Sequence, residues 1–290
     1  MKRDYFEYND LILRKMSLFL NLEPDFITKD IIDELTNEFD ISKKDAFSYI
    51  LASAVGLDID NNDTHREIFE LYFPFMVREL EPLDFESDPY YRAIGLKEQK
   101  VGTWELLYKS YKPYEAFVCD DLVSLPDGRI IPQIAFFDRE YKYPCVLENG
   151  REWMLITPNE INTMREPVLR AHGRVLTYGL GLGYFAFMCA EKESVESVTV
   201  IEKDENVIEL FERCILPSIK CSSKITVICG DAFEFAKHRA KDGNFDFIFA
   251  DIWHDASDGV SAYKRFKELE SLCPLAEFAY WIEKTLKVYL

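Results

Sequence analysis

The amino-acid sequence predicts an α/β fold: a Rossmann-like open parallel sheet preceded by a helical region and a small antiparallel β unit. Three observations support this prediction. Apolar residues recur at helical spacing in residues 1–115, turn signals separate β-rich stretches in residues 116–157, and strand and helix patterns alternate from Gly173 onward. Such alternation implies a parallel sheet. We therefore expect three consecutive segments, residues 1–115, 116–157 and 158–290.

The first segment should contain helices with recognisable start and stop signals. Ser42 can cap a helix because Asp45 follows three residues later, and Gly56 suits the end of that helix. Pro74 should kink the helix in which it lies. The expected helices cover about residues 26–39, 42–56 and 64–80.

The second segment is rich in residues that favour strands. Pro126-Asp127-Gly128 is a turn signal, and Asn149-Gly150 is a strong signature of a two-residue hairpin. These turns separate two pairs of strands, residues 116–119 with 128–137 and residues 143–147 with 152–157.

The third segment should form the parallel sheet. Strands are expected at residues 174–178, 197–202, 224–229 and 245–251, and helices at residues 184–193, 205–219 and 232–241. Only 39 residues follow Asp251, and their apolar residues from Phe278 to Leu290 recur at helical spacing. We therefore expect a sheet shortened at its C-terminal side, with strands from residues 116–157 beside the strand that ends at Asp251.

Composition and charge restrict the partners of the chain. Its 290 residues are 48% hydrophobic and carry a net charge of −18, which disfavours attraction to the phosphate backbone of nucleic acids. Residues 1–115 hold 14 Lys and Arg against 24 Asp and Glu, a net charge of −10. A small cationic or neutral molecule, or a protein, is the expected substrate, and a nucleic acid is not expected.

Neither the apolar runs nor the cysteines suggest a membrane or metal protein. No run of about 18 apolar residues is present, and the N-terminus does not resemble a signal peptide, so a cytoplasmic protein without a membrane span is expected. The seven cysteines form no CxxC pair, and we interpret them as reduced core residues rather than metal ligands. The sequence does not indicate an oligomeric state.

A glycine-rich turn is the strongest local signal for a ligand site. Gly179, Gly181 and Gly183 follow the first expected strand of the sheet and precede a helix. Glycines allow a sharp turn and bring main-chain groups close to a ligand at the helix N-terminus. Tyr184 occupies the position where a dinucleotide fingerprint requires its last glycine, which disfavours a dehydrogenase.

Acidic residues stand at the carboxyl ends of the next three strands, where open α/β sheets bind ligands. Glu202 ends the second strand and can accept hydrogen bonds from both hydroxyls of a ribose. Asp231 follows the third strand and can accept from an adenine amino group, and next to it along the chain are Ala232 and Phe233, whose ring can pack on the base. Asp251 ends the fourth strand.

These positions together resemble the successive motifs of class I S-adenosylmethionine-dependent methyltransferases. The resemblance covers about residues 173–255 and lies in the spacing of the motifs. It implies S-adenosylmethionine as cofactor, with Gly179, Gly181 and Gly183 facing its methionine part. It further implies that Glu202 holds the ribose and that Asp231 meets the adenine.

One departure from the family favours a related enzyme class. Methyltransferases usually carry an acid two residues before the first glycine, where this chain has Thr177. Spermidine-synthase-like aminopropyltransferases, which share the fold, commonly lack that acid and also carry a β unit before the sheet. Their glycine loop is richer in glycine, however, and their tyrosine–aspartate loop has no counterpart here.

Asp251 and His254 are the candidate catalytic residues. Transfer from a sulfonium is an in-line displacement, so the protein chiefly aligns the nucleophile and excludes water. Asp251 could orient an amine, and His254 could act as a base near neutral pH. Trp253 could pack against the cofactor or a cationic substrate. Alternatively, Asp251 caps a helix and His254 is an ordinary loop residue, while Glu160, just before the sheet, either lines the pocket or stabilises a helix N-terminus.

The sequence thus leads to an S-adenosylmethionine-dependent methyltransferase acting on a small molecule or protein. A spermidine-synthase-like aminopropyltransferase and a non-catalytic cofactor-binding scaffold with a protein partner are the alternatives.

Overall fold

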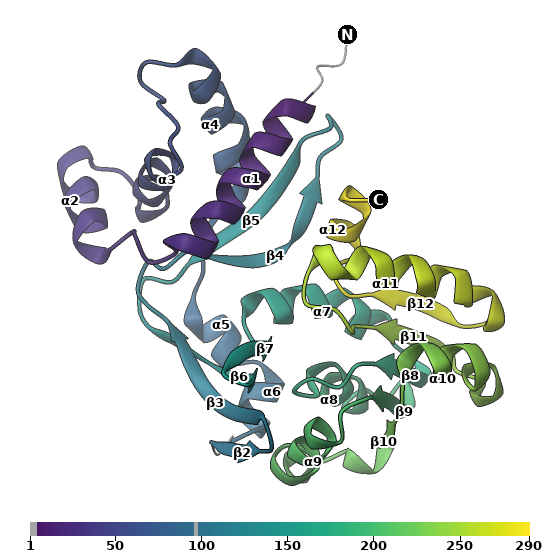
Figure 1. Cartoon of the computed structure of the whole chain (residues 1–290). Helices are drawn as coiled ribbons and strands as arrows, with labels where there is room; N and C mark the ends of the chain where they lie inside the picture. Colours follow the sequence, from purple (N-terminus) through teal and green to yellow (C-terminus); the bar gives the residue numbers. More distant parts are fainter. Residues whose placement is uncertain (1–4, 96–97) are drawn as a thin grey trace. The chain divides into compact units, whose positions relative to one another are not determined.

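The computed structural model describes residues 5–95 and 98–290 and divides the chain into two compact units (Figure 1). The first unit runs to Phe85 and resumes from Ser110 to Lys142, and the second comprises Glu86–Lys109 and Tyr143–Leu290. The units therefore interleave along the chain, whereas the sequence suggested three consecutive segments. The difference arises because the strands expected as one β unit belong to two sheets, one in each unit.

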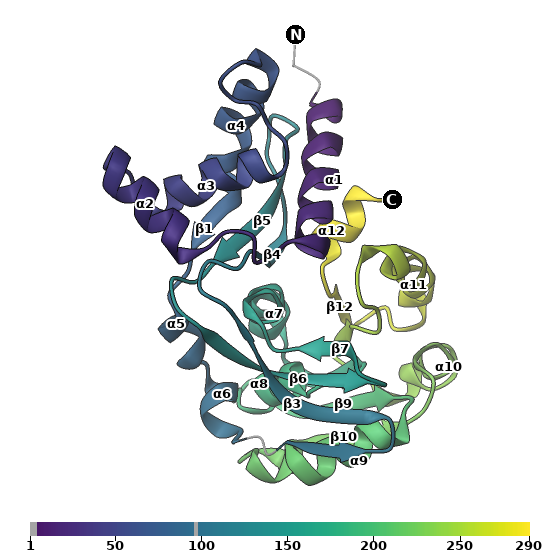
Figure 2. The ribbon, with the colours of Figure 1, turned by 60° about the vertical axis from the view of Figure 1, so that its left-hand side comes forward.

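The first unit packs helices around a three-stranded sheet of order β1-β5-β4 (Figure 2). Its core is continuous from the first helix to the last strand, and Asn9 of the first helix accepts hydrogen bonds from the Tyr72 hydroxyl (2.7 Å) and the Ile130 N–H (2.9 Å). The elements are α1 (Phe6–Leu22), α2 (Lys29–Phe39), α3 (Lys43–Ala54), α4 (Asp63–Met76), β1 (Val77–Glu79), α5 (Pro82–Glu86), β4 (Phe117–Ser124) and β5 (Ile130–Phe136).

The helix signals of the first unit act as expected, with one correction. The Ser42 side chain accepts from the Asp45 N–H and begins α3. The helix expected to reach residue 80 ends at Met76, because Val77–Glu79 pair in parallel with β5 as strand β1. Helix α1 was not predicted; its buried positions Ile12, Met16 and Phe19 have helical spacing.

The second unit begins with a short helix and a mostly antiparallel sheet of order β2-β3-β6-β7. The expected turn connects β6 to β7, and Asn149 and Gly150 both have positive φ, 51° and 79°. Strands β2 and β3 correct the expectation that residues 1–115 are helical throughout. The elements are α6 (Pro89–Ala93), β2 (Gln99–Val101), β3 (Trp104–Tyr111), β6 (Tyr141–Glu148) and β7 (Arg151–Leu155).

A five-stranded parallel sheet of order β10-β9-β8-β11-β12 follows and confirms the Rossmann-like α/β prediction. Its first four strands agree with the expected ones to within two or three residues at each end. The elements are α7 (Pro158–Arg170), β8 (Gly173–Tyr178), α8 (Tyr184–Ala190), β9 (Val195–Glu202), α9 (Glu205–Cys214), β10 (Ile225–Cys229), α10 (Ala232–His238), β11 (Phe247–Ala250), α11 (Ala256–Leu269), β12 (Glu277–Tyr280) and α12 (Glu283–Val288), with 3₁₀ turns at Leu216–Ser218, Ser222–Lys224, Ala240–Gly243 and Glu270–Leu272.

The edge beside β11 is where the prediction was wrong. Strand β12 pairs there in parallel, with Phe247 opposite Glu277 and Ala250 opposite Tyr280, so no strand of residues 116–157 is needed. The helical stripe expected after Pro274 combined a four-residue strand with a separate helix. Ile282 stands between them in the left-handed region, at φ 46°, which no continuous helix allows.

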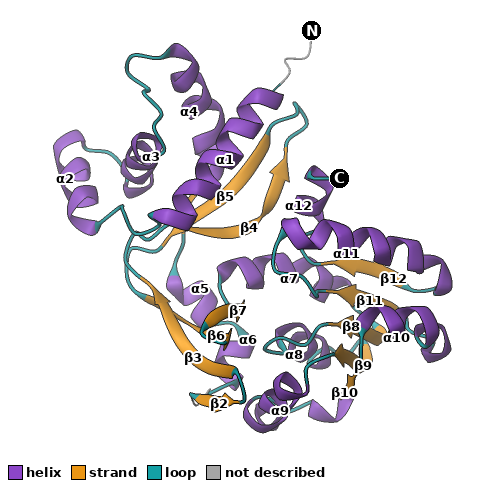
Figure 3. Cartoon of the chain, viewed as in Figure 1, coloured by secondary structure: helices purple, strands orange, loops and turns teal. Residues whose placement is uncertain are grey.

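Helices cover both faces of the parallel sheet (Figure 3). Helices α10, α11 and α12 pack on the face that presents Leu176, Tyr178 and Ile248. On the other face the ring of Phe185 in α8 stacks on Phe249 at 4.3 Å, and α7 and α9 adjoin α8 and β9. Ligands of such sheets bind at the carboxyl ends of the strands, where the sequence places its glycines and acids.

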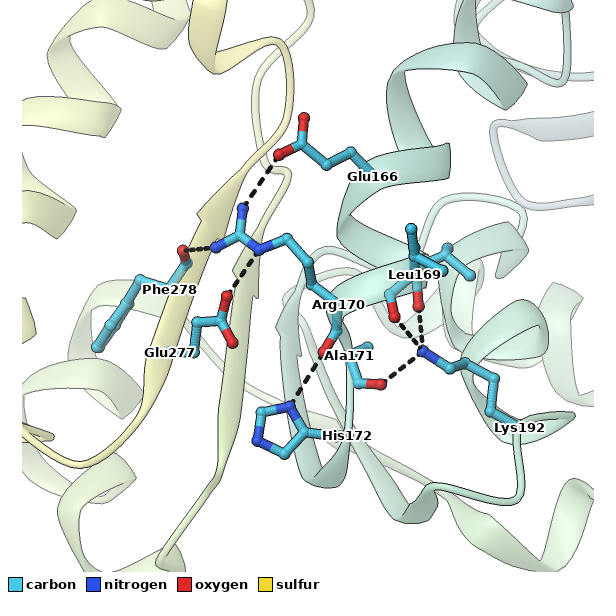
Figure 4. A network of polar contacts seen from close by, with 9 residues as sticks. Glu166, Leu169, Arg170, Ala171, His172, Lys192, Glu277 and Phe278 are labelled. Carbon is cyan, nitrogen blue, oxygen red and sulfur yellow. Dashed lines mark hydrogen bonds and ion pairs between the residues drawn. The ribbon is translucent and has the colours of Figure 1, made fainter.

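A polar network fixes the C-terminal end of α7 (Figure 4). The Lys192 ammonium donates to the carbonyl oxygens of Val168, Leu169 and Ala171 at 2.5, 2.7 and 2.6 Å. Arg170 donates to the Glu277 carboxylate (2.7 Å) and the Phe278 carbonyl (3.2 Å). The C-terminal end of α7 is thereby attached to the turn that follows α8 and to β12.

No helix in the described part of the chain is both long and apolar enough for a membrane span. Cys119, Cys145 and Cys189 are buried and serve as core residues.

Candidate functional site

A crevice of about 540 Å³ lies at the carboxyl ends of β8, β9, β10 and β11. Strand β7 and the first turn of α7 complete its walls. Its volume lies within the range of about 300–1,000 Å³ that is usual for small-molecule sites. Of the predicted site residues, all except Gly183 line it: Gly179, Gly181, Glu202, Asp231, Ala232, Phe233, Asp251 and His254.

The three glycines have positive φ and different neighbours. A Cβ at Gly179 would lie 1.9 Å from the Asp251 carbonyl oxygen, and one at Gly181 would lie 1.6 Å from the Met154 sulfur. A Cβ at Gly183 would lie 2.2 Å from the buried ring of Phe211. Gly183 does not line the crevice. Its missing side chain instead allows α8 to pack closely against α9.

Met154 of β7 covers the glycine loop and was not singled out from the sequence. Its Sδ accepts a hydrogen bond from the Leu182 N–H at 3.0 Å and its side chain lines the crevice. A contact between residues 28 positions apart depends on how the two sheets meet within this unit. No local signal in the sequence reports it.

Glu202 has the geometry of a preorganised acceptor. Its Oε2 accepts from the Leu180 N–H (3.1 Å), and its Oε1 accepts from the N–H groups of Lys203 (2.8 Å) and Asp204 (3.0 Å). These bonds hold the carboxylate against the glycine loop while leaving it on the crevice wall. A carboxylate has about four acceptor sites, and with three of them engaged one remains for a ribose hydroxyl.

Asp231 caps a helix at the crevice. Its Oδ1 accepts from the N–H groups of Phe233 (2.9 Å) and Glu234 (3.0 Å), which begins α10. The Phe233 ring stacks on Phe266 at 4.6 Å and carries the Arg265 guanidinium 3.5 Å from its centroid. The ring is therefore held in place by Phe266 and Arg265, and Ala232 beside it also lines the crevice.

Asp251 and Glu160 form a pair of acidic groups in the crevice. The Asp251 carboxyl group is enclosed by protein although the residue keeps some exposure, and burial raises its pKa to about 8. Glu160 is 5% exposed, and burial followed by the Asp251 charge raises its pKa well above the ordinary value. Glu160 therefore lines the pocket, one of the two roles considered for it, and at neutral pH the pair retains at least one proton.

His254 lies at the exposed rim. Its Nδ1 is 3.4 Å from the Asp258 carboxylate, and its ring meets the edge of Trp153 at 4.2 Å between centroids. Asp255 caps α11 and Asp258 accepts from the N–H groups of His254 and Asp255. The carboxyl group next to the His254 ring is that of Asp258, not that of Asp251. The two candidate catalytic residues are therefore not paired, and Asp251 lies near Glu160 instead.

Trp253 is buried against Gly259 and also reaches the crevice lining. Its indole N–H has no partner among the described residues, while the Trp281 indole N–H donates to the Thr163 hydroxyl at 2.9 Å.

The crevice is acidic. Glu152, Glu160, Glu202, Asp231 and Asp251 line it, against Lys203 as the one lysine or arginine among the described lining residues. Glu152 is paired with Lys109. In residues 5–95 and 98–290 no group of three or more His, Cys, Asp or Glu side chains is arranged to hold a metal ion.

Comparison with known proteins identifies the matching family. Residues 168–270 match the family model described as "Spermine/spermidine synthase domain", which belongs to the class I S-adenosylmethionine-dependent methyltransferase-like superfamily. This match confirms the superfamily inferred from the motifs. No curated protein sequence matches the chain.

Two solved structures are similar to part of the chain. Spermidine synthase from Thermotoga maritima is 16% identical with a TM-score of 0.36, and the similarity covers 64% of this chain and 55% of that one. Spermidine synthase in complex with the transition state analogue AdoDATO is 15% identical with a TM-score of 0.35, over 63% of this chain and 55% of that one. The chain thus corresponds to about half the length of each.

Proposed function

We propose that this chain, whose residues 168–270 match the spermine/spermidine synthase domain, is a transferase that moves an aminopropyl group from an S-adenosyl nucleoside to a small amine. The acidic lining of the crevice carries this proposal beyond the family match. It favours the aminopropyltransferase alternative over the methyltransferase that the motif spacing first suggested.

The nucleoside part of the donor suits the rim of the sheet. The anchored carboxylate of Glu202 would accept from a ribose hydroxyl, and the base would lie beside Phe233, with Asp231 near its amino group. Gly179 and Gly181 let the glycine loop pack directly against the Asp251 carbonyl oxygen and the Met154 sulfur, and the sulfur end of the ligand would lie along this loop.

Charge favours the decarboxylated donor. S-adenosylmethionine carries a carboxylate, which the carboxylates of Glu202 and Asp231 would repel and which Lys203 alone among the described lining residues would attract. A decarboxylated donor carries only positive charges, on sulfur and on its primary amine. An acidic crevice is complementary to those charges.

Asp251 supplies the acid–base group. A protonated amine is not nucleophilic, so the acceptor must lose a proton before its nitrogen attacks. Burial raises the pKa of the Asp251 carboxyl toward that of an amine, so its carboxylate form is a stronger base than an ordinary aspartate. The bound sulfonium supplies the carbon that the nitrogen attacks, and the C–S bond breaks to leave methylthioadenosine as the N–C bond forms.

Product analysis tests the proposal. The protein is incubated with decarboxylated S-adenosylmethionine or S-adenosylmethionine, each with a panel of small amines, and the nucleoside products are separated. Methylthioadenosine from the decarboxylated donor, formed only when an amine is present, is the expected result. S-adenosylhomocysteine from the second donor would instead support methyl transfer, a candidate that Lys203 on the crevice favours, and neither product would support a binding scaffold.

A further inference from the structure

Glu160 carries a buried carboxyl group with an oxygen that is unsatisfied among the described residues. It lies in the first turn of α7, is 5% exposed, and its Oε1 makes no hydrogen bond to any described residue. A buried polar group left in this state costs about 1–3 kcal/mol, and more when it is charged. Such a group needs an explanation, and a ligand that supplies the missing donor is one.

The groups that face Glu160 do not supply that donor. Tyr90 of α6 and Tyr184 of α8 lie near enough for Glu160 to influence their hydroxyls. The Tyr90 hydroxyl donates to the Leu182 carbonyl at 2.6 Å, and the Tyr184 hydroxyl donates to Asp88 at 3.0 Å. Each hydroxyl has a single proton to donate, and the third group that acts on Glu160, Asp251, is another carboxyl.

The other acids of the crevice are already engaged. Glu202 and Asp231 accept from main-chain N–H groups, and Glu152 pairs with Lys109. Two acids remain among the described lining residues, Glu160 and Asp251. Neither carboxyl group has a cation or an N–H donor beside it in the described part of the chain.

We infer that Glu160 and Asp251 together form a binding site for a protonated primary amine. An ammonium group has three donors, which two carboxyl groups can satisfy, and its charge is strongly favoured beside carboxylates in an enclosed site. The amine is either the aminopropyl end of the donor or the amine of the acceptor. The inference rests on the proposed function and assigns Glu160, which lies outside the matched residues 168–270, to ligand binding.

Isothermal titration calorimetry with three ligands tests this site. Methylthioadenosine has no ammonium group. Decarboxylated S-adenosylmethionine carries the ammonium group of the donor, and 1,4-diaminobutane carries the ammonium groups of an acceptor. The diamine is titrated into the protein both with and without methylthioadenosine. The variants are Glu160→Gln, which keeps the shape of the side chain, and the control Glu166→Gln, an exposed position of the same helix that pairs with Arg170 and Lys284 at 3.6 Å.

Glu160→Gln should keep the methylthioadenosine affinity within about twofold and weaken one ammonium-bearing ligand at least about tenfold, as for a lost hydrogen bond to a charged group. Loss for the decarboxylated donor identifies the donor's amine, and loss for the diamine identifies the acceptor's. The control should bind all three ligands like the wild type. Unchanged affinity of Glu160→Gln for both ammonium ligands would overturn the inference.

Two further results distinguish a failure of the amine site from a failure of the proposed function. If methylthioadenosine does not bind the wild type, the proposed function fails, while the diamine titration without nucleoside still decides the amine site. If Glu160→Gln does not fold, proton release by the wild type decides it. Binding of an ammonium should ionise the pair, so the apparent enthalpy should depend on the ionisation enthalpy of the buffer, and its independence of the buffer would contradict the site.

Discussion

At the scale of single residues, the crevice shows how one side chain can be both anchor and binding group. The Glu202 carboxylate accepts N–H groups from the glycine loop and from the start of the α9 connection, so its position is set before any ligand arrives. Binding to a preorganised acceptor loses less conformational entropy than binding to a mobile one. The same bonds mean that a substitution at this position has two effects, on the ligand and on the loop.

Glu202→Ala should weaken methylthioadenosine binding by about 2–4 kcal/mol, because a ribose hydrogen bond to a charged acceptor and the Leu180 anchor are both lost. Calorimetry on the folded variant measures the effect, and Glu205→Ala, an exposed position in the first turn of α9, serves as control. Equal affinity in the variant and the wild type would remove Glu202 from the site.

Gly181→Ala and Gly183→Ala should fail in different ways. At position 181 the new Cβ meets the end of the flexible Met154 side chain, which can move into the crevice, so the fold should persist while nucleoside binding is lost. At position 183 the Cβ meets the buried Phe211 ring, and both positions add about 1 kcal/mol of left-handed backbone strain. Gly183→Ala should therefore lower the thermal unfolding midpoint by more. A larger loss of stability at position 181 would contradict these assignments.

At the scale of elements, the local signals in the sequence were sufficient wherever the structure is determined locally. The Ser42 cap and the Asn149-Gly150 turn lie where they were expected, because each depends on hydrogen bonds or φ values within a few residues. The first four strands of the parallel sheet were predicted from their apolar runs, which are typical of strands buried on both faces.

Elements that depend on distant partners were missed. Strand β12 has only four residues, and its apolar positions fit a helical repeat as well as a strand. Strand β1 ended a predicted helix early because β5, far along the chain, pairs with it. Glu160 was noticed but could not be assigned, since the sequence does not reveal that the first turn of α7 meets the end of β11.

Lys192→Met should destabilise the second unit through α7. The ammonium group satisfies three carbonyl oxygens at the end of that helix, and a cation there also interacts favourably with the helix dipole. We expect a loss of about 1–3 kcal/mol in the free energy of unfolding, measured by urea denaturation. The exposed Lys220→Met variant, as control, should change it by less than about 0.5 kcal/mol.

At the scale of the whole molecule, the acidic pair should make stability depend on pH in an unusual direction. Asp251 has a pKa of about 8 when folded, against an ordinary value of 3.8. Between these values the unfolded chain has released a proton that the folded protein keeps, so the free energy of unfolding falls as pH rises. The slope is at most about 1.4 kcal/mol per pH unit for this group.

The double variant Glu160→Gln/Asp251→Asn should remove that slope. Its free energy of unfolding should exceed that of the wild type at pH 8. The difference should shrink as the pH falls through the ordinary pKa values of 3.8 for Asp251 and 4.5 for Glu160, below which the unfolded chain also keeps both protons. Denaturant titrations at several pH values measure the free energy of unfolding of the variant and of the wild type. In the difference between the two, the contribution of the other acidic residues cancels. Parallel curves would show that the pair ionises normally in the folded protein.

The central position of β8 in the parallel sheet bears on how the chain acquires its fold during synthesis. Strand β8 pairs with β9, which follows soon after it, but also with β11, which emerges only after β9, α9, β10 and α10. Until then one edge of a strand containing Val175, Leu176 and Tyr178, all buried in the finished protein, has no partner. An apolar unpaired edge is a template for strands of other chains. Nascent chains paused between β9 and β11 should therefore be the species most in need of a chaperone.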